Sequence, residues 1–359
     1  MDTNATAVKS KRKTYIDFLR IVAIYMVLFN HSGKNGMMLF TISRQSPFYP
    51  FYLFNSIFIK IAVPVFLMIS GTLLLGKNES YSDIVKRFLK FAAVLLAASF
   101  ISYLYDCFYR HSMTFSIIDF FIRVYKQPIS IALWYMYSYL AFILMLPFMR
   151  TLAQNMDKNA FRWMLVMHGL ISLLPIIEYI LRQGKIHHYS GFSFFISPQF
   201  VLYPLLGYYF GYRIKEEELS AKTMFGLIIA GISAIVLCSV MTHWKCTLTG
   251  EWDSSKCQTF FNTLIFLPSC ATFYTARYIF SRYTISPRIC RTISTIGGAT
   301  FGLFLLERIC RFTTEPIRVA LRPYMPTILA CWIWIFAACT LGIVITLVLK
   351  KIPFIAKVL

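Results

Sequence analysis

The amino-acid sequence predicts an all-α membrane protein, a bundle of about ten transmembrane helices with both termini in the cytoplasm. Composition is the first observation: 58% of the 359 residues are hydrophobic and the mean hydropathy is +0.62. Only 14% of residues are charged, whereas a soluble domain carries roughly a quarter. Second, the apolar residues form long uniform runs, which excludes the alternating strands of a membrane β-barrel. Third, basic residues gather in the connections between those runs.

Ten apolar runs are long enough to cross the hydrocarbon core, which takes a helix of about 20 residues. They lie near residues 15–33, 51–75, 88–107, 131–149, 161–181, 194–212, 223–243, 259–281, 293–310 and 328–349. Pro198, Pro204 and the glycines at 297–298 interrupt the sixth and ninth runs. The first run is too long for the apolar part of a signal peptide, and no small-residue cleavage site follows it, so we expect it to be retained.

Three regions follow from this assignment. We expect a basic cytoplasmic tail over residues 1–14, a ten-span membrane domain over 15–350 and a short cytoplasmic tail over 351–359. With the N-terminus inside, 21 of the 36 Lys and Arg residues lie in cytoplasmic segments and 13 in outer segments, as the positive-inside rule requires. The connection over 108–130 contains FSIIDFFIRVY, whose mixed apolar and charged residues predict a short interfacial helix.

The same distribution of basic residues accounts for the formal net charge of +21. We therefore expect the bilayer and its headgroups as partners, and no nucleic acid. Cysteine usage gives no sign of a metal site, because no CxxC motif or His/Cys cluster has ligand spacing, so no metal is expected. Five cysteines in or beside apolar runs are expected to be small buried hydrophobic residues: Cys107, Cys238, Cys270, Cys331 and Cys339.

Two further cysteines, Cys246 and Cys257, bracket the loop CTLTGEWDSSKC, which is on the outer side in this orientation. The outer face is oxidising, so the two residues have the setting that a disulfide needs. Two free thiols remain the alternative.

Ionisable side chains at membrane depth cost about 2.5–3.5 kcal/mol each on insertion scales, so each one raises a functional hypothesis. Eight such residues stand out: Asp17, Arg20, His31, Lys60, His168, Glu178, Glu307 and Arg308. Two of them, Glu178 and Arg308, lie near the ends of runs, where they can reach water. A lone histidine such as His168 is more typical of a helix contact than of a catalyst.

Arg20 and His31 form the most informative pair. Eleven residues of helix make about three turns plus 20°, so both side chains share one face, roughly 16 Å apart along the axis. Asp17 precedes Arg20 by three residues and can pair with it. Arginine binds phosphate or a polarised carbonyl, and histidine can take a proton from a hydroxyl. The alternative is an arginine that snorkels inward and a histidine that caps the helix at the outer interface.

Sequence motifs extend this observation to most of the chain. The first run carries R-x10-H in IDFLRIVAIYMVLFNH, and the second reads KIAVPVFLMISGTLLLG. The third run begins with VKRFLK, the fourth contains LWY at 133–135 followed by Pro147, and the ninth contains TFGLF at 300–304. Together these motifs resemble those of the membrane-bound acyltransferase 3 family, in which ten spans with both termini inside are usual.

The resemblance implies an activity. Family members move an acyl group, usually acetyl from cytoplasmic acetyl-CoA, to a hydroxyl of a cell-surface or lipid-linked glycan. The chain would then be a multi-pass O-acyltransferase of a plasma membrane, of bacterial type, with acetyl-CoA as donor substrate. The glycan acceptor and the acyl group, acetyl or a short diacid such as succinyl, remain open. Members with an added SGNH domain pass the acyl group to it; without one, this chain completes the transfer or uses a separate extracytoplasmic partner enzyme.

Residue roles also follow from the resemblance. His31 is expected to be the general base, and Arg20, with Asp17, to position the thioester or phosphate groups. Four basic residues are expected to attract the CoA phosphates: Lys60, Lys86, Arg87 and Lys90. For Ser70 and Gly71 a substrate path and simple helix packing both remain open. For Trp134 and Tyr135 the alternatives are an acceptor pocket and an interface anchor.

The chain departs from the family pattern at three positions. Ala132 and Glu307 stand where relatives often have histidine, and Lys90 replaces the second arginine of R-x-x-R. Glu307 can still act as a base or orient one, and Lys90 keeps its charge without the bidentate fork.

Two other functions compete with the enzyme. A transporter or flippase would move a glycan or acylated intermediate without catalysis, but it would more readily show two similar halves with broken helices. A sensory module would usually carry a cytoplasmic output domain. The basic start of the third run and the R-x10-H pair favour the acyltransferase.

Overall fold

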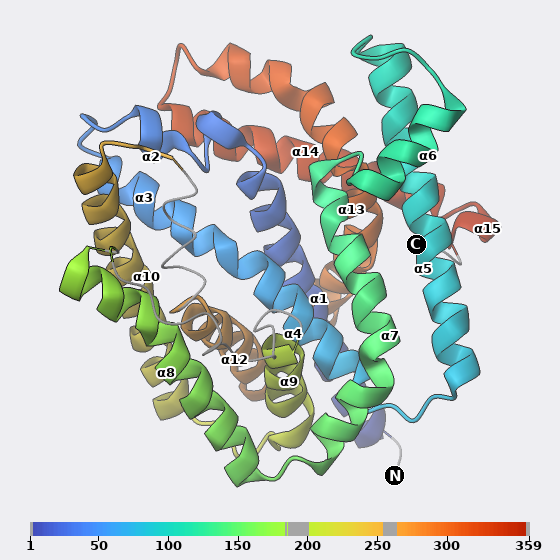
Figure 1. Ribbon diagram of the computed structural model, residues 1–359. Coiled ribbons are helices and arrows are strands. Elements are labelled where there is room, and N and C mark those ends of the chain that lie inside the picture. Colours follow the sequence, from blue (N-terminus) through green and yellow to red (C-terminus); the bar gives the residue numbers. More distant parts are fainter. Residues whose placement is uncertain (1–2, 184, 186–200, 254–263, 357–359) are drawn as a thin grey trace. The chain divides into compact units, whose positions relative to one another are not determined.

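The computed structural model describes residues 3–183, 185, 201–253 and 264–356, with side chains from residue 14 onward. Within these ranges the chain forms helices and connecting turns, with no strand (Figure 1). The prediction of an all-α protein is therefore confirmed.

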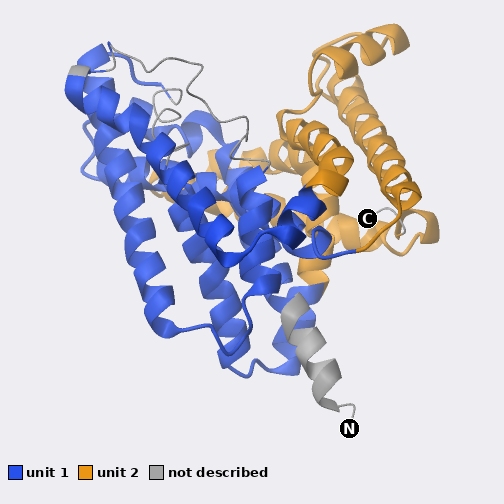
Figure 2. Ribbon diagram, turned by 60° about the horizontal axis from the view of Figure 1, so that its bottom comes forward, with its two compact units in different colours: residues 1–77, 149–294 blue, residues 78–148, 295–359 orange. Residues whose placement is uncertain are grey.

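The chain divides into two compact units, which Figure 2 colours separately. Unit 1 comprises residues 1–77 and 149–294, and unit 2 comprises 78–148 and 295–359. Unit 1 contains α1 (Thr3–Asn30), α2 (Leu39–Ile42), α3 (Tyr49–Phe58), α4 (Ala62–Leu74), α8 (Lys158–Arg182), α9 (Tyr203–Tyr208), α10 (Ala221–Thr249) and α12 (Phe266–Arg282). Unit 2 contains α5 (Tyr81–Leu104), α6 (Ile117–Lys126), α14 (Thr327–Leu349) and α15 (Pro353–Ala356). The residues of α7 (Trp134–Asn155) and α13 (Pro287–Leu321) are divided between the units.

Seven helical segments of the described chain are long and apolar enough to cross a membrane. They are Tyr49–Leu74, Tyr81–Tyr109, Ile131–Asn155, Lys158–Leu181, Ala221–Thr249, Pro287–Leu321 and Thr327–Leu349. These segments correspond to seven of the ten predicted runs, and the protein is a multi-pass membrane protein. The first and eighth runs are the helices α1 and α12. Residues 201–212 of the sixth run are described and include α9, whereas 194–200 lie outside the described residues. The glycines at 297–298 do not interrupt α13.

The second span is bent by its own sequence. A 3-10 turn, Ile59–Ile61, separates α3 from α4 and carries Lys60. Pro64 follows within the first turn of α4. Proline has no N–H to donate to the carbonyl four residues earlier, so the α-helical hydrogen bond to Lys60 cannot form. The turn therefore places a lysine at the bend between two apolar helices.

The contact between α4 and α9 is backbone on backbone. A Cβ added to Gly71 would overlap the carbonyl oxygen of Pro204, and one added to Gly207 would overlap that of Met68. The Thr72 hydroxyl donates to the Gly207 carbonyl at 2.6 Å. Gly207 and Gly211 make a G-x3-G pair, the spacing that lets membrane helices approach closely. Only residues without a side chain fit at this crossing.

Several arginines bond to carbonyls at helix ends. The Arg150 Nε donates to the Leu74 carbonyl at 3.0 Å, and the Arg213 Nη2 donates to the carbonyls of Gln154 and Met156 at 2.9 Å each. Arg277 donates to the carbonyls of Phe210 and Ile214. The last four carbonyls of a helix have no partner within it. A cation at this end also interacts favourably with the helix dipole. These charges therefore stabilise helix ends in unit 1.

The short helix predicted within 108–130 is confirmed as α6. Ser116 caps it by accepting the Asp119 N–H, and Phe120 is buried. The phenol of Tyr103 accepts the Ser116 N–H at 3.0 Å and ties α6 to α5. Arg123 Nε donates to Asp119 at 2.6 Å, and this bond raises the pKa of the Arg123 guanidinium.

Burial of the five cysteines in apolar runs is also confirmed. Cys246 is buried too. Cys257 lies outside the described residues, so the predicted disulfide stays a prediction.

Candidate active site

Asp17 and Arg20 form an ion pair on α1. The Arg20 Nη1 lies 2.8 Å from Asp17 Oδ1, and the Arg20 and Asp17 side chains are 33% and 14% exposed. Helix α1 continues without interruption from there to Asn30, so His31 follows directly on its last residue. The common face that the spacing predicts therefore holds along the described helix.

A hydrogen-bonded corner follows His31. The His31 N–H donates to the carbonyls of Val27 and Leu28, which extends the last turn of α1 by one residue. The Ser32 hydroxyl donates to the Phe29 carbonyl at 2.6 Å and accepts the Met37 N–H at 3.0 Å. These bonds fix the chain direction after His31, whose side chain is half-buried.

Helix α1 packs against α4, α12 and the 3-10 turn that carries Lys60. The rings of Tyr15 and Phe273 meet edge to face at 5.9 Å, which ties α1 to α12. On α4, Ser70 donates to the Phe66 carbonyl at 2.9 Å, and Gly71 lies against Pro204. The structure therefore brings the motifs of the first two runs together within unit 1.

The basic start of the third run lies in unit 2. Ser80 and Asp83 form a capping box that starts α5, which places Lys86, Arg87 and Lys90 within its first three turns. The Arg87 Nη2 pairs with the Glu79 carboxylate, while Lys86 and Lys90 are exposed. Residues three or four apart share a helix face. Three cations therefore stand near one end of α5.

The motifs of the third, fourth and ninth runs also meet in unit 2, through aromatic rings. Tyr135 contacts Phe304 edge to face at 6.1 Å, and Tyr139 contacts Phe91 at 5.0 Å. Phe91 in turn contacts Phe301 at 5.7 Å. Trp134 lies beside Tyr135, with ring centroids 6.1 Å apart. An aromatic cluster thus follows directly on Lys90 along α5.

Glu307 is fully buried on α13, one turn beyond Phe304. Its Oε1 accepts from the Arg311 Nε at 2.9 Å, and the Arg311 side chain is 12% exposed. This charge-assisted bond holds the Glu307 carboxylate in place. Ala132, another of the three departures from the family pattern, is buried just before α7.

The place of Arg308 near the end of a run had suggested contact with water. Its side chain instead forms an ion pair within unit 2 and is 20% exposed. Its Nη2 donates to both oxygens of Asp106, at 2.8 and 2.9 Å. Asp106 is 2% exposed and lies in a π-helical turn, Tyr105–Tyr109, that ends α5. A π turn inserts one residue into a helix, and here that turn presents the carboxylate to α13.

Two features of these sites escaped the sequence. Asp106 falls inside the third apolar run, and an acid there with an arginine near the end of another run was the available signal. Gly207 and Gly211 carry the G-x3-G spacing within the sixth run, and that spacing was the signal for a close helix contact. His168 shows the predicted helix contact, with its Nε2 3.2 Å from the Ser172 hydroxyl and its ring against Phe266.

The residues that the sequence singles out lie in both units. Unit 1 holds the R-x10-H helix with its Ser-Gly neighbour, and unit 2 holds the basic start of α5, the aromatic cluster and Glu307. Among the described residues no group of three or more His, Cys, Asp or Glu side chains is placed to hold a metal ion.

Comparison with known protein families identifies the family to which the sequence belongs. A family model described as an acyltransferase domain matches residues 13–351, which is nearly the whole chain. No curated protein and no solved structure matches the sequence. The family match covers every motif described above, in both units. The chain therefore belongs to the membrane-bound acyltransferase 3 family.

Proposed function

We propose that this membrane acyltransferase is an O-acyltransferase that moves an acyl group, most simply acetyl, from cytoplasmic acyl-CoA to a hydroxyl of a cell-surface or lipid-linked glycan. The supporting observation is the α1 arrangement, an Asp17–Arg20 ion pair on an uninterrupted helix whose last residue is followed directly by His31. Ten spans with both termini inside, in a bacterial plasma membrane, complete the proposal. In that orientation Arg20 stands toward the donor side and His31 toward the acceptor side.

His31 removes the proton from the attacking hydroxyl as general base. The new ester bond forms between that oxygen and the acyl carbonyl carbon, the thioester C–S bond breaks, and CoA leaves as the thiol. Arg20, on the donor side, offers planar donors that position the thioester or phosphate groups of the acyl-CoA. Asp17 holds the guanidinium in position.

The basic residues Lys60, Lys86, Arg87 and Lys90 attract the CoA phosphates, Arg87 by its fork and the lysines as point charges. Trp134 and Tyr135 shape the acceptor pocket, to which the aromatic cluster gives a rigid wall. Ser70 and Gly71 line the path beside α1, and Glu307, held by Arg311, takes the place of the second histidine. A separate extracytoplasmic enzyme can receive the acyl group from this chain.

Acyl turnover by purified protein in lipid tests the proposal. Radiolabelled acetyl-CoA is supplied to the wild type, Arg20→Ala and His31→Ala, and released CoA and protein-bound label are measured. The proposal expects turnover or labelling by the wild type and its loss in both variants, by about 100-fold or more. If the wild type neither binds nor consumes acetyl-CoA, or if all three proteins behave alike, the proposal fails, and glycan transport without catalysis becomes the working hypothesis.

A further inference from the structure

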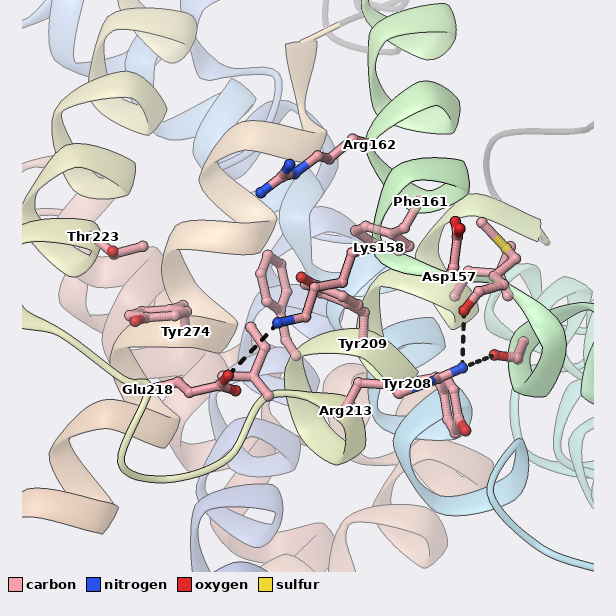
Figure 3. Close-up of a pocket in the computed structure, with 15 residues that line it drawn as sticks. Asp157, Lys158, Phe161, Arg162, Tyr208, Tyr209, Arg213, Glu218, Thr223 and Tyr274 are labelled. Atoms are coloured by element: carbon pink, nitrogen blue, oxygen red, sulfur yellow. Dashed lines mark hydrogen bonds and ion pairs between the residues drawn. The ribbon is translucent and has the colours of Figure 1, made fainter.

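A pocket of about 560 Å³ opens in unit 1, away from the α1 residues already described (Figure 3). It lies where the end of α7, the start of α8, the π turn Tyr209–Arg213 and the start of α10 meet. Its size is that of a small-molecule site, since such sites span roughly 300–1,000 Å³. The proposed acyl transfer assigns no role to it.

Aromatic rings form much of the pocket wall. Phe161 of α8 stacks on Tyr209 with ring centroids 4.0 Å apart and an angle of 11° between the ring planes. Phe210 and Tyr274 meet edge to face at 6.0 Å. Tyr208 completes the set of lining rings. These side chains give the pocket a rigid apolar surface.

Two cations reach over this surface. Lys158 and Arg162 come from the first two turns of α8, and both side chains extend toward the wall formed by Thr223 and Tyr274 (Figure 3). Lys158 lies 3.8 Å from Glu218, and its side chain is 73% exposed. Such an exposed pair is weak and screened by salt. Within the described chain Arg162 makes no ion pair, hydrogen bond or ring contact, and it is exposed.

The other guanidinium groups nearby are already in use. Arg213 donates to the carbonyls of Gln154 and Met156, and Arg277 donates to those of Phe210 and Ile214. These bonds satisfy helix ends and hold the two arginines in place. Arg162 serves no such end, so its five donors remain available to a ligand.

The polar groups around the pocket match an anion. Helices α8 and α10 both begin at it, and the N-terminus of a helix carries a partial positive charge. The Tyr274 oxygen accepts the Ser220 N–H at 2.9 Å, which leaves its own O–H to donate.

Each of the two carboxylates of the lining accepts a hydrogen bond from a backbone N–H group. Asp157 accepts the Ala160 N–H at 2.6 Å, and Glu218 accepts the Lys215 N–H at 2.8 Å. In the described chain neither carboxylate forms an ion pair with Arg162, and the ion pair that an incoming anion would displace is the weak one between Lys158 and Glu218.

From this arrangement we infer that the pocket binds the phosphate of a ligand that also has an apolar or planar part. Arg162 and Lys158 hold the phosphate, the Thr223 and Tyr274 hydroxyls donate to it, and the aromatic wall takes the rest of the molecule. Two sources share this chemistry, a nucleotide and an anionic phospholipid headgroup. In the proposed orientation the pocket opens to the cytoplasm, where both occur.

Binding measurements on the full-length protein in lipid nanodiscs test the inference. In one arm uridine 5′-monophosphate, a nucleotide that is not part of CoA, is titrated by calorimetry into protein in phosphatidylcholine discs. In the other arm phosphatidylglycerol is added to the discs, and the rise in unfolding temperature is measured. Each arm compares the wild type with Arg162→Gln and with Lys222→Gln, which removes an exposed charge that does not line the pocket.

The inference expects that at least one probe binds the wild type and that Arg162→Gln binds it about tenfold more weakly, since one charged hydrogen bond is worth about that factor. Lys222→Gln should bind as the wild type does. The arm that responds identifies the source of the phosphate. Binding of neither probe, or equal losses in the two variants, would overturn the inference.

The site is separable from the proposed acyl transfer. His31→Ala should bind the responding probe with wild-type affinity, whatever becomes of its turnover. Acyl transfer can therefore fail while this site stands, or the reverse.

Discussion

One helix contact in unit 1 and one in unit 2 are made by different means. In unit 1, α4 meets α9 at Gly71 and Gly207, with backbone against backbone and no charge at the contact. In unit 2, α5 is joined to α13 by the bidentate pair of Asp106 and Arg308. Both units contain an acid beside an arginine at membrane depth. The comparison shows that such a pair does not have one meaning.

The pair in unit 1 joins two residues of the same helix. Within the described chain neither Asp17 nor Arg20 forms an ion pair with a second helix, and the Arg20 side chain is one third exposed. In unit 2 the partners are 202 residues apart in sequence, and Asp106 is almost fully buried. The Asp106–Arg308 pair therefore joins two helices of unit 2, whereas the Asp17–Arg20 pair lies within one helix, where we propose that it serves acyl transfer.

The largest effect on stability is expected from Arg308→Met. This change leaves Asp106 buried with only Arg110, 3.8 Å away, as a remaining ion partner in the described chain. Leaving one member of a buried pair costs about 3–5 kcal/mol. Unfolding temperature in lipid nanodiscs should fall clearly, and the double variant Arg308→Met with Asp106→Leu should recover part of the loss. A single variant as stable as the wild type would remove the contrast between the units.

Gly207→Ala tests the other half of the comparison. The added methyl group would overlap the Met68 carbonyl, so α4 and α9 must separate, at a cost of about 1–3 kcal/mol. Gly169→Ala is the matched control, because a Cβ at Gly169 has open space around it in α8. There the higher helix propensity of alanine should stabilise by up to about 1 kcal/mol. Equal unfolding temperatures for the two variants would contradict the backbone contact.

Asp17→Asn should separate activity from stability. The pair is local and partly exposed, so its loss should cost less than about 1 kcal/mol. Acyl transfer should fall about tenfold, because Arg20 loses the group that orients it. A variant that unfolds readily, or that transfers acyl groups at the wild-type rate, would place this pair in the structural class of unit 2.

The smallest effect on stability is expected from Glu218→Gln, because the Glu218 side chain is exposed. The Lys215 N–H and nearby cations lower the pKa of Glu218 below its ordinary value of 4.5. A carboxylate with a lowered pKa contributes stability above that ordinary value, and the contribution is lost as pH falls through the folded-state pKa. The wild type should be slightly more stable than the variant at pH 7, and the difference should vanish in acid. A difference that grows in acid would contradict the hydrogen bond to Lys215.

The sequence predicts the local features of this protein well. The Asp17–Arg20 pair follows from a spacing of three residues on a helix, and the burial of the cysteines follows from their place in apolar runs. The short helix α6 follows from its mixed composition. Each of these depends on residues near one another in the chain, where helix geometry is known in advance.

Contacts between distant residues were not predicted in the same way. Asp106 reaches Arg308 only because a π turn ends α5, and a single sequence does not show which two helices will be neighbours. For Gly71 the sequence is compatible with both a substrate path and helix packing. Its contact with Pro204 depends on the position of α9. The meeting of Tyr135 with Phe304 likewise depends on how α7 packs against α13.

One experiment tests directly whether the α1 residues serve acyl transfer while the Asp106–Arg308 pair serves stability. It measures turnover and unfolding temperature on the same nanodisc samples of Arg20→Ala, His31→Ala and Arg308→Met. The account predicts that the two α1 variants lose acyl transfer by about 100-fold or more while they unfold near the wild-type temperature. It predicts that Arg308→Met unfolds at a clearly lower temperature and, below that temperature, retains measurable turnover. The account would be contradicted if the α1 variants lost stability together with activity, or if Arg308→Met lost turnover while remaining fully stable.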